Sequence, residues 1–187
     1  MDILLLGPPG AGKGTQGALL AERLGVPKFA TGDLLRDAVK RGTPVGLRAK
    51  AVMEAGQLVS DDIIMGVVRD ELAKVEARNG VIFDGVVRTV PQAESVTTVL
   101  HELGRQMDHV FFFDVPDIEI IARIEKRLMI EGRADDDPKA VATRLKAYRT
   151  QTAPVLEWYR QRGKVHLIPA VGAIHEISGR VREILGR

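Results

Sequence analysis

A glycine-rich segment near the start of the chain, GPPGAGKGT from Gly7 to Thr15, limits the fold more than any other feature. It follows the apolar run Asp2–Leu6, which predicts a buried parallel strand, and it leads into a leucine pattern with helical spacing over Lys13–Leu24. Glycines let successive backbone N–H groups face one concavity, and the free N–H groups and dipole of the following helix favour an anion. The segment therefore predicts a strand, a phosphate-binding loop and a helix.

The loop follows the pattern G-x-x-x-x-G-K-[ST] with one change, because Gly14 comes directly after Lys13 and the hydroxyl follows one residue later, at Thr15. Lys13 supplies positive charge to the β- and γ-phosphates, and Thr15 can place its hydroxyl near the phosphates or Mg²⁺. Asp84 lies just past the apolar run Val81–Phe83, where a carboxylate holds Mg²⁺ or its waters in such proteins. An Asp-Gly pair after a strand is by itself more typical of a turn, but beside the phosphate loop it favours the Mg²⁺ role.

Strand and helix patterns alternate along the chain. Short apolar runs predict five strands, at Asp2–Leu6, Lys28–Ala30, Val81–Phe83, Val110–Val115 and Val165–Ile168. Helical patterns predict helices at Lys13–Leu24, Asp33–Lys40, Pro44–Ala55, Asp117 to about Ile130, and Ile174–Leu185. Three further helices have a predicted cap residue. Ser60 caps a helix that runs to about Ala77, Thr89 caps one that runs to about Leu103, and Asp137 caps one that runs from Pro138 to about Arg162.

This alternation predicts an α/β fold with a mainly parallel sheet of five strands and helices on both faces. The phosphate loop after the first strand makes this the P-loop NTPase type. Sheets of this kind bind ligands at the carboxyl ends of their strands. The loops that begin near Gly7, Asp84 and Asp114 are therefore the expected site.

Composition narrows the function classes. The 187 residues form a single predicted domain, 1–187. A formal net charge of +2 and an aromatic content of 4 % argue against nucleic-acid binding, and the longest apolar runs are too short to span a membrane. The chain has no cysteine, which excludes disulfides and thiolate metal sites, and the segment Met1–Gly7 lacks the features of a signal peptide, so we expect a cytoplasmic location.

Six motifs, in order and in register, resemble those of the adenylate kinases within the nucleoside monophosphate kinase family. They are Gly7–Thr15, TGDLLR at Thr31–Arg36, GQLV at Gly56–Val59, DGxxRxxxQ at Asp84–Gln92, RADD at Arg133–Asp136 and TAP at Thr152–Pro154. The resemblance implies the reaction ATP + AMP ⇌ 2 ADP with Mg²⁺, carried out by a monomer. It also implies an AMP-binding segment at residues 30–59 and a short lid at residues 123–137, without the longer zinc-binding insert, so no zinc is expected.

The resemblance also assigns residues to roles. Those implied for ATP are Gly10, Ala11, Gly12, Lys13, Gly14, Thr15, Arg123 and Arg127. Those implied for AMP are Thr31, Gly32, Arg36, Val59, Gly85, Arg88, Gln92, Arg133 and Arg144, with Thr31 and Gln92 at the base and Arg36 and Arg88 at the phosphate. The implied catalytic residues are Lys13, Arg88, Arg123, Arg133 and Arg144.

Elementary chemistry supports a cluster of cations in such a site. Phosphoryl transfer needs in-line positioning and charge neutralisation, and an AMP phosphate is already an anion that needs no base. Two polyphosphates repel each other, so cations are needed to bring them together. Arg123 and Arg127 share a helix face, and Asp135 and Asp136 can order the lid arginines through ion pairs, or simply supply negative charge before the helix that begins at Pro138.

One departure from the family pattern bears on AMP binding. The family usually reads Asp-Gly-(Phe/Tyr)-Pro-Arg where this chain reads Asp84-Gly85-Val86-Val87-Arg88. Without the proline we expect a trans Val86–Val87 bond, and this either displaces Arg88 and the Gly85 backbone or is absorbed by the loop.

Three other functions were weighed against adenylate kinase activity. A UMP/CMP-type kinase is disfavoured because Thr31 and Gln92 both favour adenine, and a GTP-dependent switch is disfavoured because the chain has no Asn-Lys-x-Asp segment. An inactive nucleotide-binding relative stays open because of the Val86-Val87 change.

Overall fold

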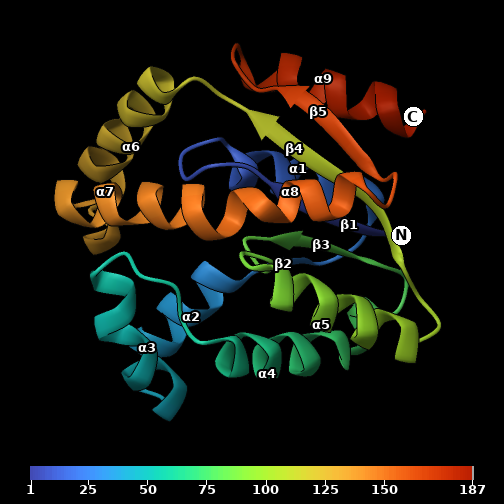
Figure 1. The fold of residues 1–187 in the computed structure, drawn as a ribbon, viewed down its shortest axis with the longest axis horizontal. Coiled ribbons are helices and arrows are strands. Elements are labelled where there is room, and N and C mark those ends of the chain that lie inside the picture. The colour runs from blue at the N-terminus through green and yellow to red at the C-terminus, as the bar shows by residue number, and fades with distance from the viewer. Residues whose placement is uncertain (187) are drawn as a thin grey trace.

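The core of the computed structural model, which describes residues 1–186, is a sheet of five parallel strands in the order β2-β3-β1-β4-β5 (Figure 1). The strands are β1 (Asp2–Leu6), β2 (Lys28–Ala30), β3 (Val81–Asp84), β4 (Met107–Asp114) and β5 (Val165–Pro169). The predicted parallel α/β fold is confirmed.

Helices cover both faces of the sheet, as predicted. They are α1 (Lys13–Leu24), α2 (Thr31–Lys40), α3 (Pro44–Glu54), α4 (Asp61–Leu72), α5 (Val90–Glu102), α6 (Asp117–Glu131), α7 (Pro138–Ala147), α8 (Ala153–Arg160) and α9 (Ile174–Leu185), with short turns η1 (Val75–Ala77), η2 (Ala134–Asp136) and η3 (Tyr148–Thr152). In residues 1–186, none of these helices has the length and apolar character needed to cross a bilayer.

The buried strand β1 divides the core into two clusters. Because side chains alternate between the faces of a strand, Ile3 and Leu5 pack in a cluster with residues of α1, α6 and α9. Leu4 and Leu6 point the other way, into a cluster built with α4, α5 and α8. All four side chains are buried, which explains why β1 reads as a continuous apolar run rather than an alternating one.

Local signals placed several helix ends correctly. Helix α1 ends at Leu24, as predicted, and the following Gly25 has a φ of 65°, the left-handed conformation that glycine adopts readily. Thr89 accepts a hydrogen bond from the Gln92 N–H at 3.3 Å, and Asp137 accepts one from the Lys139 N–H at 3.0 Å, so both act as the predicted caps.

Two helix predictions were wrong in extent. The helix after Ser60 ends at Leu72, and Val75–Ala77 forms a separate 3₁₀ turn; Ser60 itself makes no side-chain capping bond. The helix expected from Pro138 to Arg162 is divided by a π-helical turn, Tyr148–Thr152. Pro154 has no N–H and its ring needs space beside the carbonyl four residues earlier, so the wider π turn lets the helical course continue past it.

The sheet order creates a crevice at the carboxyl end of β1. The chain leaves β1 for β2 and β3 on one side and later adds β4 and β5 on the other. Ligands of open α/β sheets bind where the strand order reverses in this way. In register, Leu5 of β1 pairs with Asp84 of β3, so the phosphate-binding loop and Asp84 reach the same edge of the sheet.

Close packing of α2 on α3 depends on Gly46, which makes the Gly46→Ala variant a test of the fold. A Cβ at this position would lie 2.2 Å from the Ala38 carbonyl oxygen, so the two helices would have to separate. We expect alanine here to lower the free energy of unfolding by about 1–3 kcal/mol, measured by urea denaturation.

Gly66→Ala is the matched control. Gly66 also lies within a helix, α4, but a Cβ there would meet no atom within 4 Å. We expect this variant to be more stable by about 0.5–1 kcal/mol. Equal effects of the two substitutions would contradict the packing described for α2 and α3.

Candidate nucleotide-binding site

The loop between β1 and α1 has the shape of an anion cradle. Gly10 and Gly12 have φ values of 81° and 87°, which other residues rarely adopt. A Cβ on Gly10 would also lie 3.1 Å from the Ile120 carbonyl oxygen. Glycine is therefore favoured at this position both by its φ and by the close approach of this carbonyl group. The Lys13 ammonium curls back over the loop and donates hydrogen bonds to the Gly7 and Pro8 carbonyl oxygens, each at 2.8 Å.

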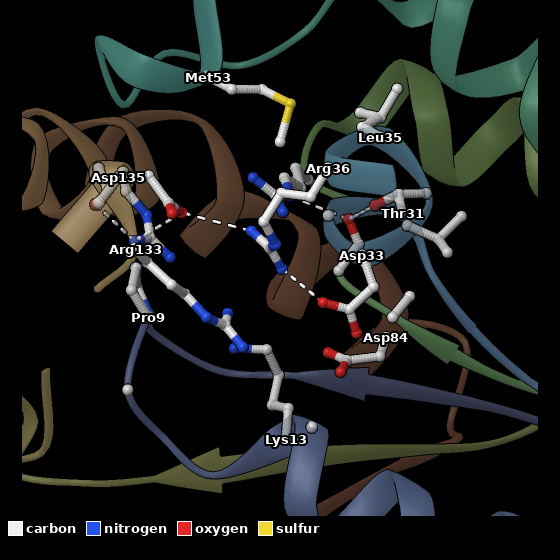
Figure 2. A pocket seen from close by; sticks show the side chains of 18 of the residues that line it. Pro9, Lys13, Thr31, Asp33, Leu35, Arg36, Met53, Asp84, Arg133 and Asp135 are labelled. Atoms are coloured by element: carbon white, nitrogen blue, oxygen red, sulfur yellow. Dashed lines mark hydrogen bonds and ion pairs between the residues drawn. The ribbon is translucent and has the colours of Figure 1, made fainter. Parts of the chain in front are cut away.

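A cavity of about 520 Å³ opens over this loop, with Lys13, Asp33, Arg36 and Asp84 facing into it (Figure 2). Every site residue predicted from the sequence lines this cavity. They are Gly10, Ala11, Gly12, Lys13, Gly14, Thr15, Thr31, Gly32, Arg36, Val59, Asp84, Gly85, Arg88, Gln92, Arg123, Arg127, Arg133 and Arg144.

Lys13 and Arg88 carry positive charge at the centre of the cavity. Burial lowers the pKa of the Lys13 ammonium to about 8, with Asp84 opposing the shift and Arg88 adding to it. Burial and the neighbouring Arg144 lower the pKa of the Arg88 guanidinium to about 10. Both groups remain protonated at neutral pH, in surroundings that favour the arrival of an anion.

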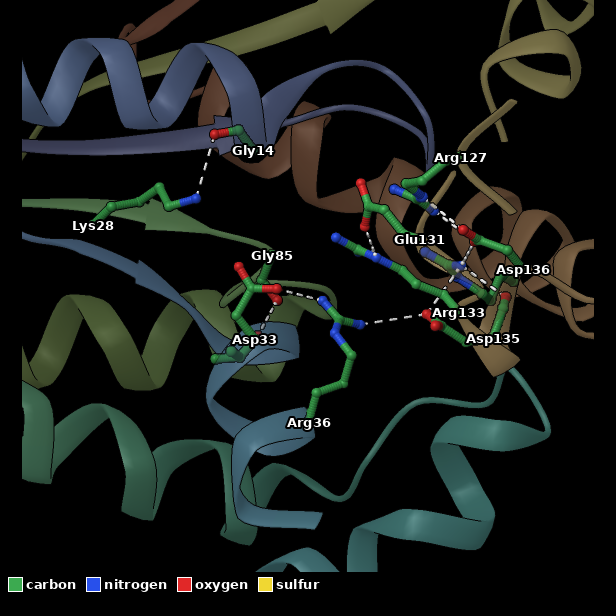
Figure 3. Close-up of polar contacts among 12 residues, drawn as sticks. Gly14, Lys28, Asp33, Arg36, Gly85, Arg127, Glu131, Arg133, Asp135 and Asp136 are labelled. Carbon is green, nitrogen blue, oxygen red and sulfur yellow. Dashed lines mark hydrogen bonds and ion pairs between the residues drawn. The ribbon is translucent and has the colours of Figure 1, made fainter. Parts of the chain in front are cut away.

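Arg127 and Arg144 are held by one buried carboxylate, that of Asp136, which Figure 3 shows beside Arg127. Arg127 donates to both oxygens of Asp136, at 2.6 and 2.5 Å, and Arg144 donates to the same carboxylate at 2.9 Å. Burial alone would raise the pKa of Asp136, but the hydrogen bond and charge of Arg127 outweigh it and hold the pKa below its ordinary value. Asp136 therefore orders Arg127 and Arg144, which is one of the two roles that the sequence left open for it.

Arg36 joins helix α2 to the turn η2. Its guanidinium lies 2.6 Å from the Asp33 carboxylate and 3.5 Å from that of Asp135 (Figures 2 and 3). Asp33 lines the cavity but was not assigned a role from the sequence. Its position in TGDLLR, three residues before Arg36, is the i, i+3 spacing at which helical side chains meet, and this signal could have identified it.

Arg123 borders the phosphate loop. It donates to Glu119 at 2.8 Å and to the Ala170 carbonyl oxygen at 2.9 Å. A Cβ on Gly12 would lie 3.8 Å from its guanidinium. Glu119 and Ala170 therefore hold Arg123 across the loop. Sequence reasoning missed the contact with Ala170 because this residue follows a different strand, β5.

Arg133 pairs with Glu131 at the end of α6.

The Val86-Val87 departure leaves the neighbouring site residues in the cavity. The Val86–Val87 bond is trans, as expected, and both side chains are buried. Arg88 still lines the cavity and donates from Nε to the Gly85 carbonyl oxygen at 2.9 Å. The loop has therefore absorbed the change without moving Arg88 out of the site.

Metal-ligating side chains are dispersed over residues 1–186, in which no group of three or more His, Asp or Glu residues is placed to share one ion. The Asp84 carboxylate stands beside the phosphate loop, since a Cβ on Gly14 would lie 3.6 Å from its Oδ2.

The fold and the loop together define a class. The parallel sheet carries the phosphate loop after its central strand and a carboxylate at the end of the neighbouring strand, and several arginines line the cavity above them. These are the parts of a P-loop nucleotide kinase. The family model described as "Adenylate kinase" matches residues 5–164. The chain belongs to the adenylate kinase family.

Known relatives are similar to this chain in sequence over nearly its whole length. An adenylate kinase of Beijerinckia indica subsp. indica is 49 % identical, with 99 % of each chain covered. One of Gemmatimonas aurantiaca is 45 % identical over 99 % of each chain. One of Xanthomonas campestris pv. campestris is 44 % identical over the full length of both.

The lowered pKa of Lys13 predicts that affinity for ATP falls at alkaline pH. A lysine with a pKa of about 8 in the free protein loses its proton between pH 7 and pH 9, and only the protonated form attracts phosphate. We expect the dissociation constant for ATP, measured by titration calorimetry, to rise by up to about tenfold across this range.

Lys13→Arg supplies the control, because arginine keeps its charge across the whole range. Its dissociation constant, whatever its absolute value, should be nearly independent of pH from 7 to 9. A wild-type affinity that does not change over this range would contradict the assigned role of Lys13.

Proposed function

We propose that this chain catalyses the reversible transfer of the terminal phosphoryl group of ATP to AMP, giving two ADP. The observation that carries the proposal is that one cavity contains two places for a nucleotide. The phosphate loop lies on one side of the cavity, and a second set of arginines beside a partly apolar recess lies on the other. Further cations line the cavity between these two sides. The family membership of the chain supports the same reaction.

The donor nucleotide is assigned to the phosphate-loop side. Residues 10–15 supply backbone N–H groups, the Lys13 ammonium and the Thr15 hydroxyl to the ATP phosphates, with Arg123 and Arg127 facing them from α6. Arg123 is held across the loop by its two partners, so it meets ATP with little loss of side-chain freedom.

The acceptor nucleotide is assigned to the segment 30–59 and the end of β3. Arg36 and Arg88 suit a phosphate, because each presents a planar fork that fits two phosphate oxygens. The base is assigned to the recess with Thr31, Gly32, Val59, Gly85 and Gln92, which also contains the apolar side chains of Leu35, Met53 and Ile64.

The chemistry needs positioning and charge rather than a nucleophilic side chain. The AMP phosphate attacks as an anion, so the protein must hold it in line with the γ-phosphate and offset the mutual repulsion. Lys13, Arg88, Arg123, Arg133 and Arg144 are assigned to this neutralisation. Residues 123–137 form the proposed lid, which excludes water, a competing acceptor of the phosphoryl group.

Mg²⁺ suits the site because the carboxylate at Asp84 stands beside the phosphate loop, close to Gly14. Mg²⁺ prefers oxygen ligands and takes most of them from water and nucleotide phosphates, and it supplies charge neutralisation at the β- and γ-oxygens. Asp84 would hold the ion through its waters, and Thr15 would place its hydroxyl toward it. We propose ATP, AMP and ADP as the ligands and a cytoplasmic monomer as the active form.

The proposal predicts that wild-type protein forms ADP from ATP, AMP and Mg²⁺ and that Lys13→Met does not. Removing a fixed cation from the transferring phosphate should lower kcat by roughly a hundredfold or more. A coupled assay measures this directly, with CMP and UMP as alternative acceptors that should react more slowly than AMP.

Lys146→Met is the matched control, because Lys146 is an exposed lysine of α7. It should retain wild-type activity. A wild-type chain that binds ATP and AMP without forming ADP, or a Lys13→Met variant with full activity, would refute the proposed function.

A further inference from the structure

The side chain of Gln92 has its orientation fixed at both ends of its amide group. Its Oε1 accepts a hydrogen bond from the Arg88 backbone N–H at 2.7 Å, and its Nε2 donates one to Asp61 Oδ1 at 2.6 Å. Only 2 % of Gln92 is exposed, and it lines the recess assigned to the acceptor base. Asp61, at the start of α4, is therefore in contact with a side chain that faces the base.

The two partners permit only one orientation of this amide. A backbone N–H can only donate, and an ionised carboxylate can only accept. Turning the amide over would place its NH₂ group against the Arg88 N–H and its carbonyl oxygen against the Asp61 carboxylate. Both contacts would become repulsive, and buried polar groups left in this way destabilise a site strongly.

The fixed amide offers a defined pattern to a base. Its Nε2 keeps one further N–H to donate, and its Oε1 keeps one further lone pair to accept. Adenine presents the complementary edge, with an acceptor at N1 and an amino donor at N6. A 6-oxopurine presents the reverse, with N1–H as donor and O6 as acceptor, so it would require the turned amide.

Thr31 favours the same choice. Its hydroxyl hydrogen is directed to the Gly85 carbonyl oxygen at 2.8 Å, which leaves its lone pairs toward the recess. Lone pairs attract the amino group of a 6-aminopurine and repel the oxygen of a 6-oxopurine.

We propose that Asp61 is a positioning residue that fixes the amide of Gln92 and thereby makes the acceptor site select 6-aminopurine over 6-oxopurine nucleoside monophosphates. The inference rests on the proposed function, because it assigns the specificity of the same acceptor site. Cytosine shares the acceptor and amino pattern of adenine, so Asp61 acts against oxo bases and not against CMP.

The test compares AMP with IMP, which differs from AMP only at the groups that Gln92 reads. The values of kcat/KM for both acceptors are measured in the wild type and in Asp61→Asn and Asp61→Leu. Leucine removes the acceptor, and we expect the AMP-to-IMP ratio to fall at least about tenfold, the effect of roughly one hydrogen bond. The loss should appear mainly as a higher KM for AMP with kcat nearly unchanged.

Asp61→Asn keeps the shape of the side chain but can turn its own amide, so it should give a ratio between those of the wild type and Asp61→Leu. If the leucine variant does not fold, the asparagine variant decides alone. A ratio that is unchanged in the folded Asp61 variants, while AMP is still phosphorylated, would overturn the inference and leave the proposed function intact.

Asp62→Leu is the matched control. Asp62 is exposed, and it shares the first turn of α4 with Asp61, so it has the same favourable interaction with the helix N-terminus. We expect its AMP-to-IMP ratio to equal that of the wild type, and an equal fall in both variants would overturn the inference. A wild type that cannot phosphorylate AMP would refute the proposed function, and the inference with it.

Discussion

An excess of positive charge, held where water is partly removed, is the constraint on which the site depends. Among the described residues that line the cavity, eight lysine and arginine side chains face four carboxylates. Burial lowers the pKa values of Lys13 and Arg88, and repulsion from neighbouring arginines, which is stronger in such surroundings than in water, lowers them further. The sheet and the loop hold the cations in place, and we propose that nucleotide phosphates supply the missing negative charge.

The carboxylates near the cavity contact two different groups of arginines. Asp136 is fully occupied with Arg127 and Arg144, so these arginines keep their direction without a ligand. Asp33 and Asp135 contact Arg36 where α2 meets the turn η2. Lys13 differs from these arginines, because neutral carbonyl oxygens rather than carboxylates accept its hydrogen bonds. Its hydrogen bonds therefore leave the charge of Lys13 unneutralised, as the proposed binding of phosphate requires.

Sequence reasoning succeeded where the signal is local. The glycines of the loop, Gly25 at the end of α1 and the caps at Thr89 and Asp137 each report a backbone conformation that neighbouring residues determine. The boundary inside the stretch from Pro138 to Arg162 was missed because a proline in a helix can be absorbed by a π turn, and a helical pattern does not distinguish the two courses. The partners Asp61 of Gln92 and Ala170 of Arg123 were missed because each lies on an element distant in sequence, and only the packing of the sheet brings them together.

The central claim is that fixed cations let two anionic nucleotides occupy one cavity together. The most direct test is a calorimetric titration of AMP into protein saturated with a non-hydrolysable ATP analogue and Mg²⁺. We expect one AMP to bind per chain, with an affinity at least equal to that for the analogue-free protein, because the two ligands share the same cations without displacing each other. Binding of AMP only as the analogue leaves would contradict this account.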